Sequence, residues 1–181
     1  MKNKVAMIHG AGGAFLAASA RKSDLARATN ETQRSSKLEA NHLMDDTNIA
    51  RQDDLEAINQ TLLDYIEGFY DGNEARMESS LHPELAKRIA NLDSASGRGY
   101  LAEMSALALT QLTRKKADRP TPAAERVQEI AVFDIFENAA SARVTASTWI
   151  DYLHLSRLNG RWVIVNVLWE MKAGQPFKPY W

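Results

Sequence analysis

The 181-residue chain has 22 Lys and Arg against 23 Asp and Glu, and this near balance excludes the strongly basic surface that nucleic acids and anionic membranes select. A hydrophobic share of 45% excludes a disordered chain, and the length suits one domain with a terminal extension. The absence of Cys excludes disulfides, thiolate metal sites and a thiol nucleophile.

Residues 1–47 differ in composition from the rest. Lys2 and Lys4 precede an apolar run that glycines interrupt, and a polar stretch follows. This composition predicts a poorly ordered leader or linker, in which case the protein is expected in the cytoplasm. The alternative is a signal peptide with 5–17 as its apolar region and 18–20 as its cleavage site, which would direct the protein to the periplasm. No apolar run reaches the roughly 20 residues of a membrane-spanning helix, so no membrane partner is expected.

Helical patterns occupy the first half of the remaining chain. Apolar residues recur every three or four positions over 55–69, which predicts an amphipathic helix. Gly72 can adopt the left-handed conformation that ends such a helix. Residues 74–81 are predicted to form a short second helix, because Pro83 disfavours helical angles in the residue before it. A third amphipathic helix is predicted over 101–112.

From Val127 the apolar period changes from 3.6 to 2, which indicates strands. The first two strands are predicted over 127–136 and 140–155. Asn159-Gly160 is a strong hairpin signal, and a third strand is predicted over 162–171. This last strand is apolar on both faces, so it is expected in the centre of the sheet. Helices followed by a curved antiparallel sheet predict an α+β fold.

The two-residue turn also predicts the register of the last two strands. Counting back from it places Asp151 opposite Leu168 and Leu153 opposite Asn166. One face of this hairpin is then expected to carry Asp151, Trp162 and Asn166. The other is expected to carry Tyr152, His154 and Trp169. A register error of one residue would exchange the two faces.

Five separate sequence blocks together resemble one family. In chain order they are 64–70 (DYIEGFY), 81–83 (LHP), 87–88 (KR), 151–155 (DYLHL) and 160–170 (GRWVIVNVLWE). Their order and spacing are similar to those of the putative lumazine-binding proteins of the nuclear transport factor 2-like superfamily. The resemblance covers residues 48–172, which leaves 173–181 as a C-terminal tail.

The resemblance implies a cone of three helices packed on a strongly curved antiparallel sheet, with a pocket at its wide end. It also implies a homodimer that pairs through the outer sheet face. Superfamily members include isomerases, dehydratases and cyclases as well as many proteins without enzymatic activity. The resemblance therefore implies a pocket but no particular reaction.

In this superfamily the hairpin face with Asp151 and Asn166 usually lines the pocket, so these two residues are the first polar candidates. A desolvated carboxylate has a raised pKa and could serve as a general base or acid. Alternatively, Asp151 forms a structural ion pair with a buried basic residue such as Arg88. His82 could face the cone mouth, or its ring could fix a turn by bonding to a nearby carbonyl. Tyr65 is expected to pack in the core with its hydroxyl bonded to a partner.

The leading hypothesis is a homodimeric domain that binds a small molecule in an apolar pocket. Its candidate ligand-binding residues are Tyr65, His82, Asp151, Trp162 and Asn166. One alternative is an isomerase-, dehydratase- or cyclase-type enzyme with Asp151 or His82 as the proton shuttle. Another is a non-catalytic interaction module whose cone is filled by its own side chains. No cofactor is expected, and no metal, because neither His82 nor His154 has a ligand partner at zinc-site spacing.

Overall fold

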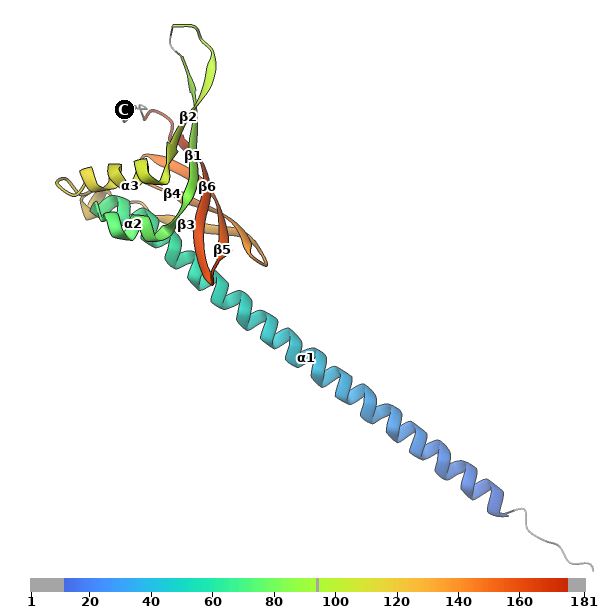
Figure 1. Cartoon of the computed structure of the whole chain (residues 1–181). Coiled ribbons are helices and arrows are strands. Elements are labelled where there is room, and N and C mark those ends of the chain that lie inside the picture. The colour runs from blue at the N-terminus through green and yellow to red at the C-terminus, as the bar shows by residue number, and fades with distance from the viewer. Residues whose placement is uncertain (1–11, 94, 176–181) are drawn as a thin grey trace, which may run out of the picture. The chain divides into compact units, whose positions relative to one another are not determined.

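The computed structural model of the chain describes residues 12–93 and 95–175 (Figure 1). It divides into two compact units, Met1–Ile49 and Ala50–Trp181. In the first unit the side chains described, at positions 27 and 29–39, are all exposed. None of the described helices combines the length and the apolar character that crossing a membrane requires.

Helix α1 runs over Gly12–Asp71 and so begins inside the stretch whose composition predicts a leader or linker. Neither Gly nor Pro occurs between positions 14 and 67, and the polar residues there do not oppose a helical backbone. The basic start of the alternative signal peptide, Lys2 and Lys4, lies outside the described residues, as do positions 176–181 of the tail. The cleavage site and the compartment remain predictions.

In the second unit, the end of α1 carries the predicted apolar stripe into the core. Ile58, Leu62 and Ile66 are completely buried. After Asp71, Gly72 has a φ of 68° and reverses the chain into α2 (Glu74–Ser80). The Asn73 side chain caps α2 by accepting a hydrogen bond from the Arg76 backbone N–H. Both the helix end at Gly72 and the short second helix are thus confirmed.

The next segment corrects the prediction of a third helix over 101–112. Strands β1 (Leu81–Leu92) and β2 (Gly99–Ser105) form an antiparallel hairpin, and helix α3 (Ala106–Lys115) starts only afterwards. Alternate burial in β2 shows the strand period, since Ala102 and Met104 are buried between exposed neighbours. The prediction was wrong for residues 101–105. A short apolar run fits the helical period as well as the strand period, and pairing with β1 makes this run a strand.

The remaining strands complete one six-stranded sheet. They are β3 (Glu129–Phe136), β4 (Ala139–Thr145), β5 (Trp149–Leu158) and β6 (Arg161–Met171). The predicted single strand over 140–155 is wrong, because a turn in which the Ala146 N–H donates to the Trp149 carbonyl separates β4 from β5. A short 3₁₀ helix, Ala123–Glu125, precedes β3.

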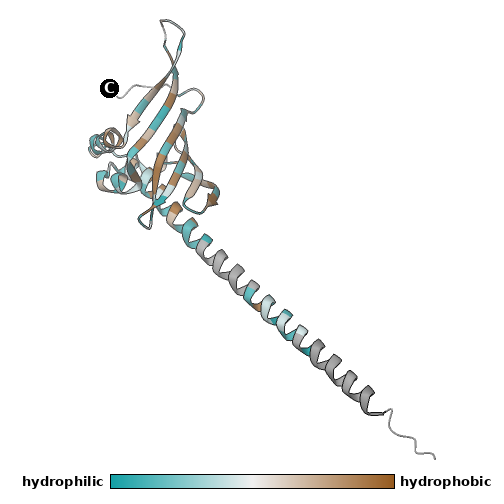
Figure 2. Ribbon diagram, turned by 45° about the vertical axis from the view of Figure 1, so that its right-hand side comes forward, coloured by the Kyte–Doolittle hydropathy of each residue, from teal (hydrophilic) through white to brown (hydrophobic). Residues whose placement is uncertain are grey.

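The sheet order is β2-β1-β6-β5-β4-β3, so β6 is central, as predicted. Every neighbouring pair is antiparallel except β1 and β6, which are parallel. The end of α1, with α2 and α3, lies on one side of the curved sheet (Figure 1). Hydrophobic and hydrophilic residues alternate along several strands (Figure 2), as expected for a sheet with one face in the core. The predicted α+β class, with helices packed on a curved sheet, is confirmed.

The last hairpin turns where the sequence predicts, with positive φ at Asn159 and Gly160 and with Leu158 opposite Arg161. Further from the turn the predicted register is wrong. The pairing jumps from Leu155 with Ile164 to His154 with Asn166, so β6 contains one extra residue. From this bulge onward, each residue of β6 therefore lies on the sheet face opposite to the one predicted for it.

Three predicted positions depend on this bulge. Asp151 pairs with Trp169 rather than with Leu168. Trp169 is buried with the core, whereas it was predicted on the outer face. Asn166 pairs with His154 on the outer face, whereas it was predicted beside Asp151. A strand register that is counted from the turn is valid only up to the first bulge in either strand.

Candidate functional site

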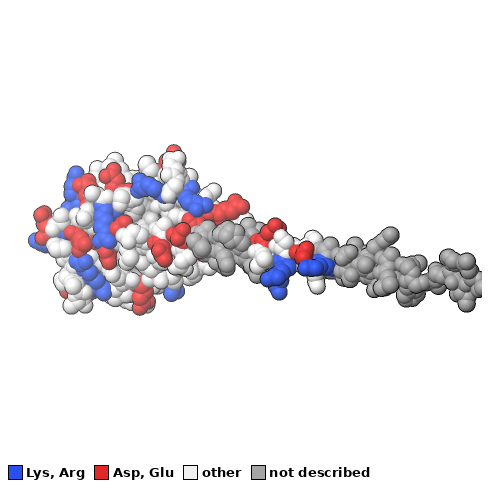
Figure 3. Space-filling view, turned by 90° about the horizontal axis from the view of Figure 1, so that it is seen from below, with Lys and Arg blue, Asp and Glu red and all other residues white. Residues whose placement is uncertain are grey.

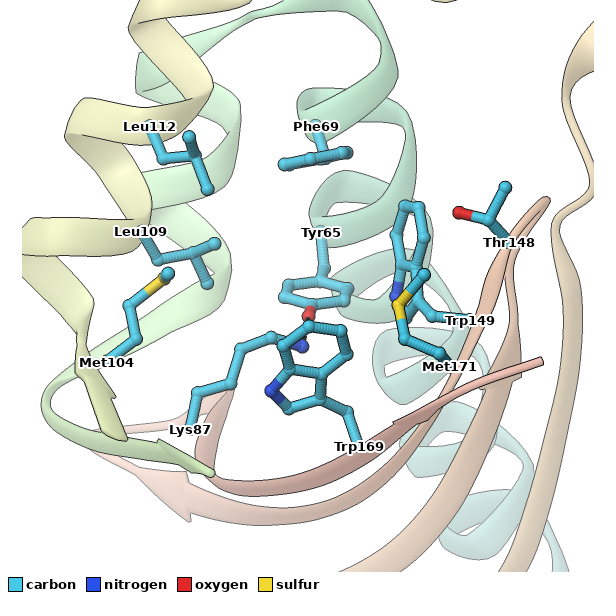
Figure 4. Close-up of a pocket in the computed structure, with 10 residues that line it drawn as sticks. All are labelled: Tyr65, Phe69, Lys87, Met104, Leu109, Leu112, Thr148, Trp149, Trp169 and Met171. Carbon is cyan, nitrogen blue, oxygen red and sulfur yellow. Dashed lines mark hydrogen bonds between the residues drawn. The ribbon is translucent and has the colours of Figure 1, made fainter. Parts of the chain in front are cut away.

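A pocket opens between α1, α3 and the sheet, with an empty volume of about 480 Å³ counting the space open to solvent. Ten residues line it: Tyr65, Phe69, Lys87, Met104, Leu109, Leu112, Thr148, Trp149, Trp169 and Met171. Figure 4 shows Tyr65 and Phe69 from α1 facing Leu109 and Leu112 from α3. The lining is therefore largely aromatic and aliphatic, and its polar groups are an ammonium, two hydroxyls and two indole N–H groups.

Lys87 forms a buried ion pair with Asp151. Its Nζ donates hydrogen bonds to Asp151 Oδ1 and, over 2.8 Å, to the Tyr65 hydroxyl. The Asp151 side chain is 0% exposed and that of Lys87 is 7% exposed. Either charge alone would be costly at this depth, but the pair is formally neutral.

The second Asp151 oxygen completes the cluster. Oδ2 accepts from the Tyr65 hydroxyl over 3.1 Å and from Trp149 Nε1 over 2.7 Å. The Tyr65 hydroxyl consequently accepts from Lys87 and donates to Asp151. Three donors, from α1, β1 and β5, thus hold one carboxylate. Asp151 lies behind Tyr65 and Lys87 and is not among the pocket-lining residues.

The environment shifts the pKa values of two of these groups. Burial lowers the pKa of Lys87 from its ordinary value, although the charge and hydrogen bond of Asp151 oppose this change. Burial, followed by the charge and hydrogen bond of Asp151, raises the pKa of Tyr65 well above 10. Tyr65 therefore remains a protonated donor over the whole physiological pH range.

Replacing Tyr65 by Phe is expected to lower the free energy of unfolding by about 1–3 kcal/mol at pH 7, because hydrogen bonds to two charged groups are lost. Since the pKa of Tyr65 is raised on folding, its contribution is complete below the unfolded value of about 10 and falls as pH rises through the folded value. Urea unfolding of both proteins at several pH values should show the gap shrinking above pH 10. A gap that stays constant above this pH would contradict the assignment.

Aromatic rings surround the ammonium group. Lys87 Nζ lies 5.0 Å from the Trp169 ring centroid and 5.5 Å from that of Tyr65. Phe69 and Trp149 meet edge to face, with centroids 5.3 Å apart. These contacts between residues of α1 and the sheet hold the pocket walls in position without a ligand.

The structure brings only part of the predicted site together. Tyr65 lines the pocket, and its hydroxyl meets Asp151, 86 residues away in sequence. Trp162 is buried elsewhere, where its Nε1 donates to Asp54 over 2.9 Å. His82 does not line the pocket, and its Nδ1 accepts from the Glu84 backbone N–H over 3.2 Å. This contact differs from the alternative role predicted for His82, because the ring accepts from an N–H rather than bonding to a carbonyl, and His82 lies in β1 rather than in a turn.

Asn166 lies outside the pocket as well. Its Oδ1 accepts from Arg88 Nη1 over 3.2 Å, and Arg88 also pairs with Glu103. The structural ion pair of Asp151 exists, but its partner is Lys87 and not Arg88. Neighbouring residues on a strand point to opposite faces, so β1 turns Lys87 inward and Arg88 outward. Whether any predicted residue contacts a ligand remains a prediction.

Sequence reasoning missed Lys87, Trp149 and Trp169 as pocket residues. For Lys87 a sequence signal was present, because Leu85 and Ile89 stand two positions on either side of it, in the period of a strand. Trp169 was assigned to the wrong face because of the bulge in β6. Nothing in the local sequence marks Trp149 as a donor to Asp151.

The described residues contain no group of three or more His, Asp and Glu side chains placed to hold a metal ion. On the face seen in Figure 3, Lys and Arg alternate with Asp and Glu, so neither sign of charge dominates it. The distinctive chemistry of the described domain therefore lies in the aromatic pocket and in the ion pair beneath it.

The solved structures with a similar fold include three nuclear transport factor 2-like proteins of unknown function. The Shewanella baltica protein is 20% identical with a TM-score of 0.56, covering 67% of this chain and 96% of its own. The Silicibacter pomeroyi protein is 16% identical with a TM-score of 0.56, covering 67% and 98%. The Methylobacillus flagellatus protein is 22% identical with a TM-score of 0.52, covering 67% and 94%. Identities this low show a shared fold only.

No curated protein matches the chain. The sequence model of one family, described as putative lumazine-binding, matches residues 53–170, which is most of the second unit. This match includes both Lys87 and Asp151 and all of the strands except the last residue of β6. The chain therefore belongs to the putative lumazine-binding family, with a nuclear transport factor 2-like fold.

Proposed function

We propose that the domain binds a small, flat, uncharged cyclic molecule in the pocket above Lys87. The observation that carries this proposal is the combination of aromatic walls with a single buried ammonium group. Flat rings bind well between aromatic side chains, and a few fixed polar groups orient them. The family description agrees, because lumazine is a flat heteroaromatic compound.

The charges beneath the pocket favour an uncharged ligand. Asp151 already balances Lys87, so a ligand with a net charge would bring an unpaired charge into a dry site. An ammonium group has three donors, and Lys87 directs two of them to Asp151 and Tyr65. A ligand carbonyl oxygen is a suitable acceptor for the third.

The two alternative functions have less support. Neither Asp151 nor His82 lines the pocket, so a proton shuttle through either residue would have no direct contact with a ligand there. An interaction module with a filled cone would show no ligand-dependent stabilisation with any compound, which the thermal-shift panel below tests. Binding is therefore the function that we propose.

We also propose that two copies pair through the outer sheet face, defined here by Tyr152, Leu168, Arg88 and Arg143. Tyr152 and Leu168 are cross-strand neighbours and are 47% and 50% exposed. Arg143 pairs with Tyr152 and Arg88 with Leu168, so an apolar centre lies between two basic residues. An apolar centre with a polar rim is typical of protein interfaces.

Native mass spectrometry of the protein from its own host tests both proposals. We expect a dimer that retains a small molecule, and a saturating ligand at 100 times its Kd should stabilise the protein by about 2.7 kcal/mol. Leu109→Trp fills the pocket from α3 and should abolish retention. Leu107→Trp, on the same helix but 67% exposed, is the matched control and should retain the ligand.

Two results would contradict these proposals. If no flat cyclic carbonyl compound in a thermal-shift panel stabilises the wild-type protein, the pocket is not a ligand site. If the native spectrum contains single chains at micromolar concentration, the outer face is not a dimer interface. Circular dichroism of both Trp variants establishes that they are folded.

A further inference from the structure

The primary amine of Lys87 is a nucleophile inside the pocket. Its side chain is only 7% exposed, yet Lys87 is one of the residues that line the cavity. The flanking rings of Tyr65 and Trp169 shield it from bulk water. We propose that Lys87 condenses with an aldehyde or ketone ligand to form an imine, a step that rests on the proposed function of the pocket as a ligand site.

Only the neutral amine attacks a carbonyl, so the ammonium proton must first have an acceptor. Asp151 Oδ1 is in direct contact with Lys87 Nζ and is that acceptor. Proton transfer converts an ion pair into a neutral amine and a carboxylic acid, and the cluster stays formally neutral throughout. Burial also lowers the pKa of Lys87, because a dry site disfavours the charged form.

The reaction balances without an oxidant or reductant. The amine lone pair forms a bond to the carbonyl carbon, and the carbonyl π electrons move to the oxygen. The oxygen takes up the proton of the Asp151 carboxyl by way of Tyr65, and the nitrogen gives one of its two protons back to the carboxylate, which yields a neutral carbinolamine. The nitrogen then loses its remaining proton, the hydroxyl group takes one up and leaves as water, and a carbon–nitrogen double bond forms. One amine and one carbonyl thus give one imine and one water.

Tyr65 is the group placed to move protons between the reacting atoms. Its hydroxyl accepts from Lys87 Nζ over 2.8 Å and donates to Asp151 Oδ2 over 3.1 Å. It can therefore pass a proton from the Asp151 carboxyl to the leaving oxygen while keeping one itself. Its raised pKa keeps it protonated between these transfers.

The titratable groups that contact Lys87 Nζ are Asp151 on β5 and Tyr65 on α1. The lining from β2, α3 and β6 is uncharged and consists of Met104, Leu109, Leu112, Trp169 and Met171. The reactivity of the amine should therefore depend on the protonation of Lys87, Asp151 and Tyr65. We expect it to react at a lower pH than exposed lysines do.

The experiment uses the full chain, benzaldehyde as the probe and sodium cyanoborohydride, which reduces an imine to a stable secondary amine. Peptide mapping by mass spectrometry then compares Lys87 with the exposed Lys115 at pH 7. We expect labelling of Lys87 to be faster by about tenfold for each unit by which its pKa is lowered. Unfolding in urea should make the two rates equal.

Three variants test whether the amine that reacts fast is the one inside the pocket. Lys115→Met should leave the fast label in place, and Leu109→Trp should block it by filling the pocket. Lys87→Met removes the labelled amine, and if that variant does not fold, Leu109→Trp still provides the test. A fast label that persists in a folded Leu109→Trp protein would place the reaction outside the pocket and overturn the proposal.

The imine proposal and the binding proposal fail in different ways. Equal labelling of Lys87 and Lys115 in the folded protein, together with stabilisation by flat ligands, would overturn imine formation and leave ligand binding intact. Equal labelling without stabilisation by any ligand would overturn both.

Discussion

Replacing Asp151 by Ala is expected to lower the free energy of unfolding by about 3–5 kcal/mol, the largest effect of any single change in the site. The substitution leaves the Lys87 ammonium buried without its counter-charge. It also removes the acceptor of Tyr65 and Trp149. Urea unfolding followed by circular dichroism measures this loss. The exposed Asp118→Ala is the matched control, with an expected change within about 0.5 kcal/mol.

A second variant separates loss of the ion pair from general damage to the core. When Lys87→Met accompanies Asp151→Leu, no charge remains buried, so most of the lost stability should return. A loss below about 1 kcal/mol for Asp151→Ala would show that water reaches Lys87 and solvates it. The pocket would then lack the desolvated, formally neutral ion pair on which both proposals about ligands depend.

Replacing Gly72 by Ala is expected to cost about 2–5 kcal/mol, because two penalties add. Gly72 has a φ of 68°, which costs an L-residue roughly 1–2 kcal/mol. A Cβ atom there would also lie 2.3 Å from the backbone nitrogen of Ala117, and relieving such an overlap typically costs about 1–3 kcal/mol. Urea unfolding of the variant against the wild type measures the sum.

Gly160 provides the matched control for this prediction. Its φ is 76°, but a Cβ atom there would have no neighbour within 4 Å. Gly160→Ala should therefore show only the conformational penalty of roughly 1–2 kcal/mol. Equal losses for the two variants would mean that the chain near Ala117 moves aside without cost.

These two glycines show how far local patterns predict the fold. A positive φ at Gly72 and the hairpin at Asn159-Gly160 are both predictable, because they depend on a few adjacent residues. The close approach of Ala117 to Gly72 is not predictable in this way, because 45 residues separate the two positions along the chain. The apolar stripe of α1 and the central place of β6 likewise follow from sequence periods.

The sequence by itself determined the family, the α+β class and the helix that lines the pocket, and it selected Tyr65 and Asp151 as candidate site residues. Only the tertiary structure decided that Lys87 is their partner and that Trp169 faces the pocket. The physical reason is that the deciding contacts are non-local: β1 pairs with β6, and Lys87 meets Asp151, which is 64 residues away in sequence. The bulge in β6, which turns Trp169 inward, is likewise absent from a register counted from the turn. Those contacts set which side of a strand each residue faces, and hence which charges meet in the core.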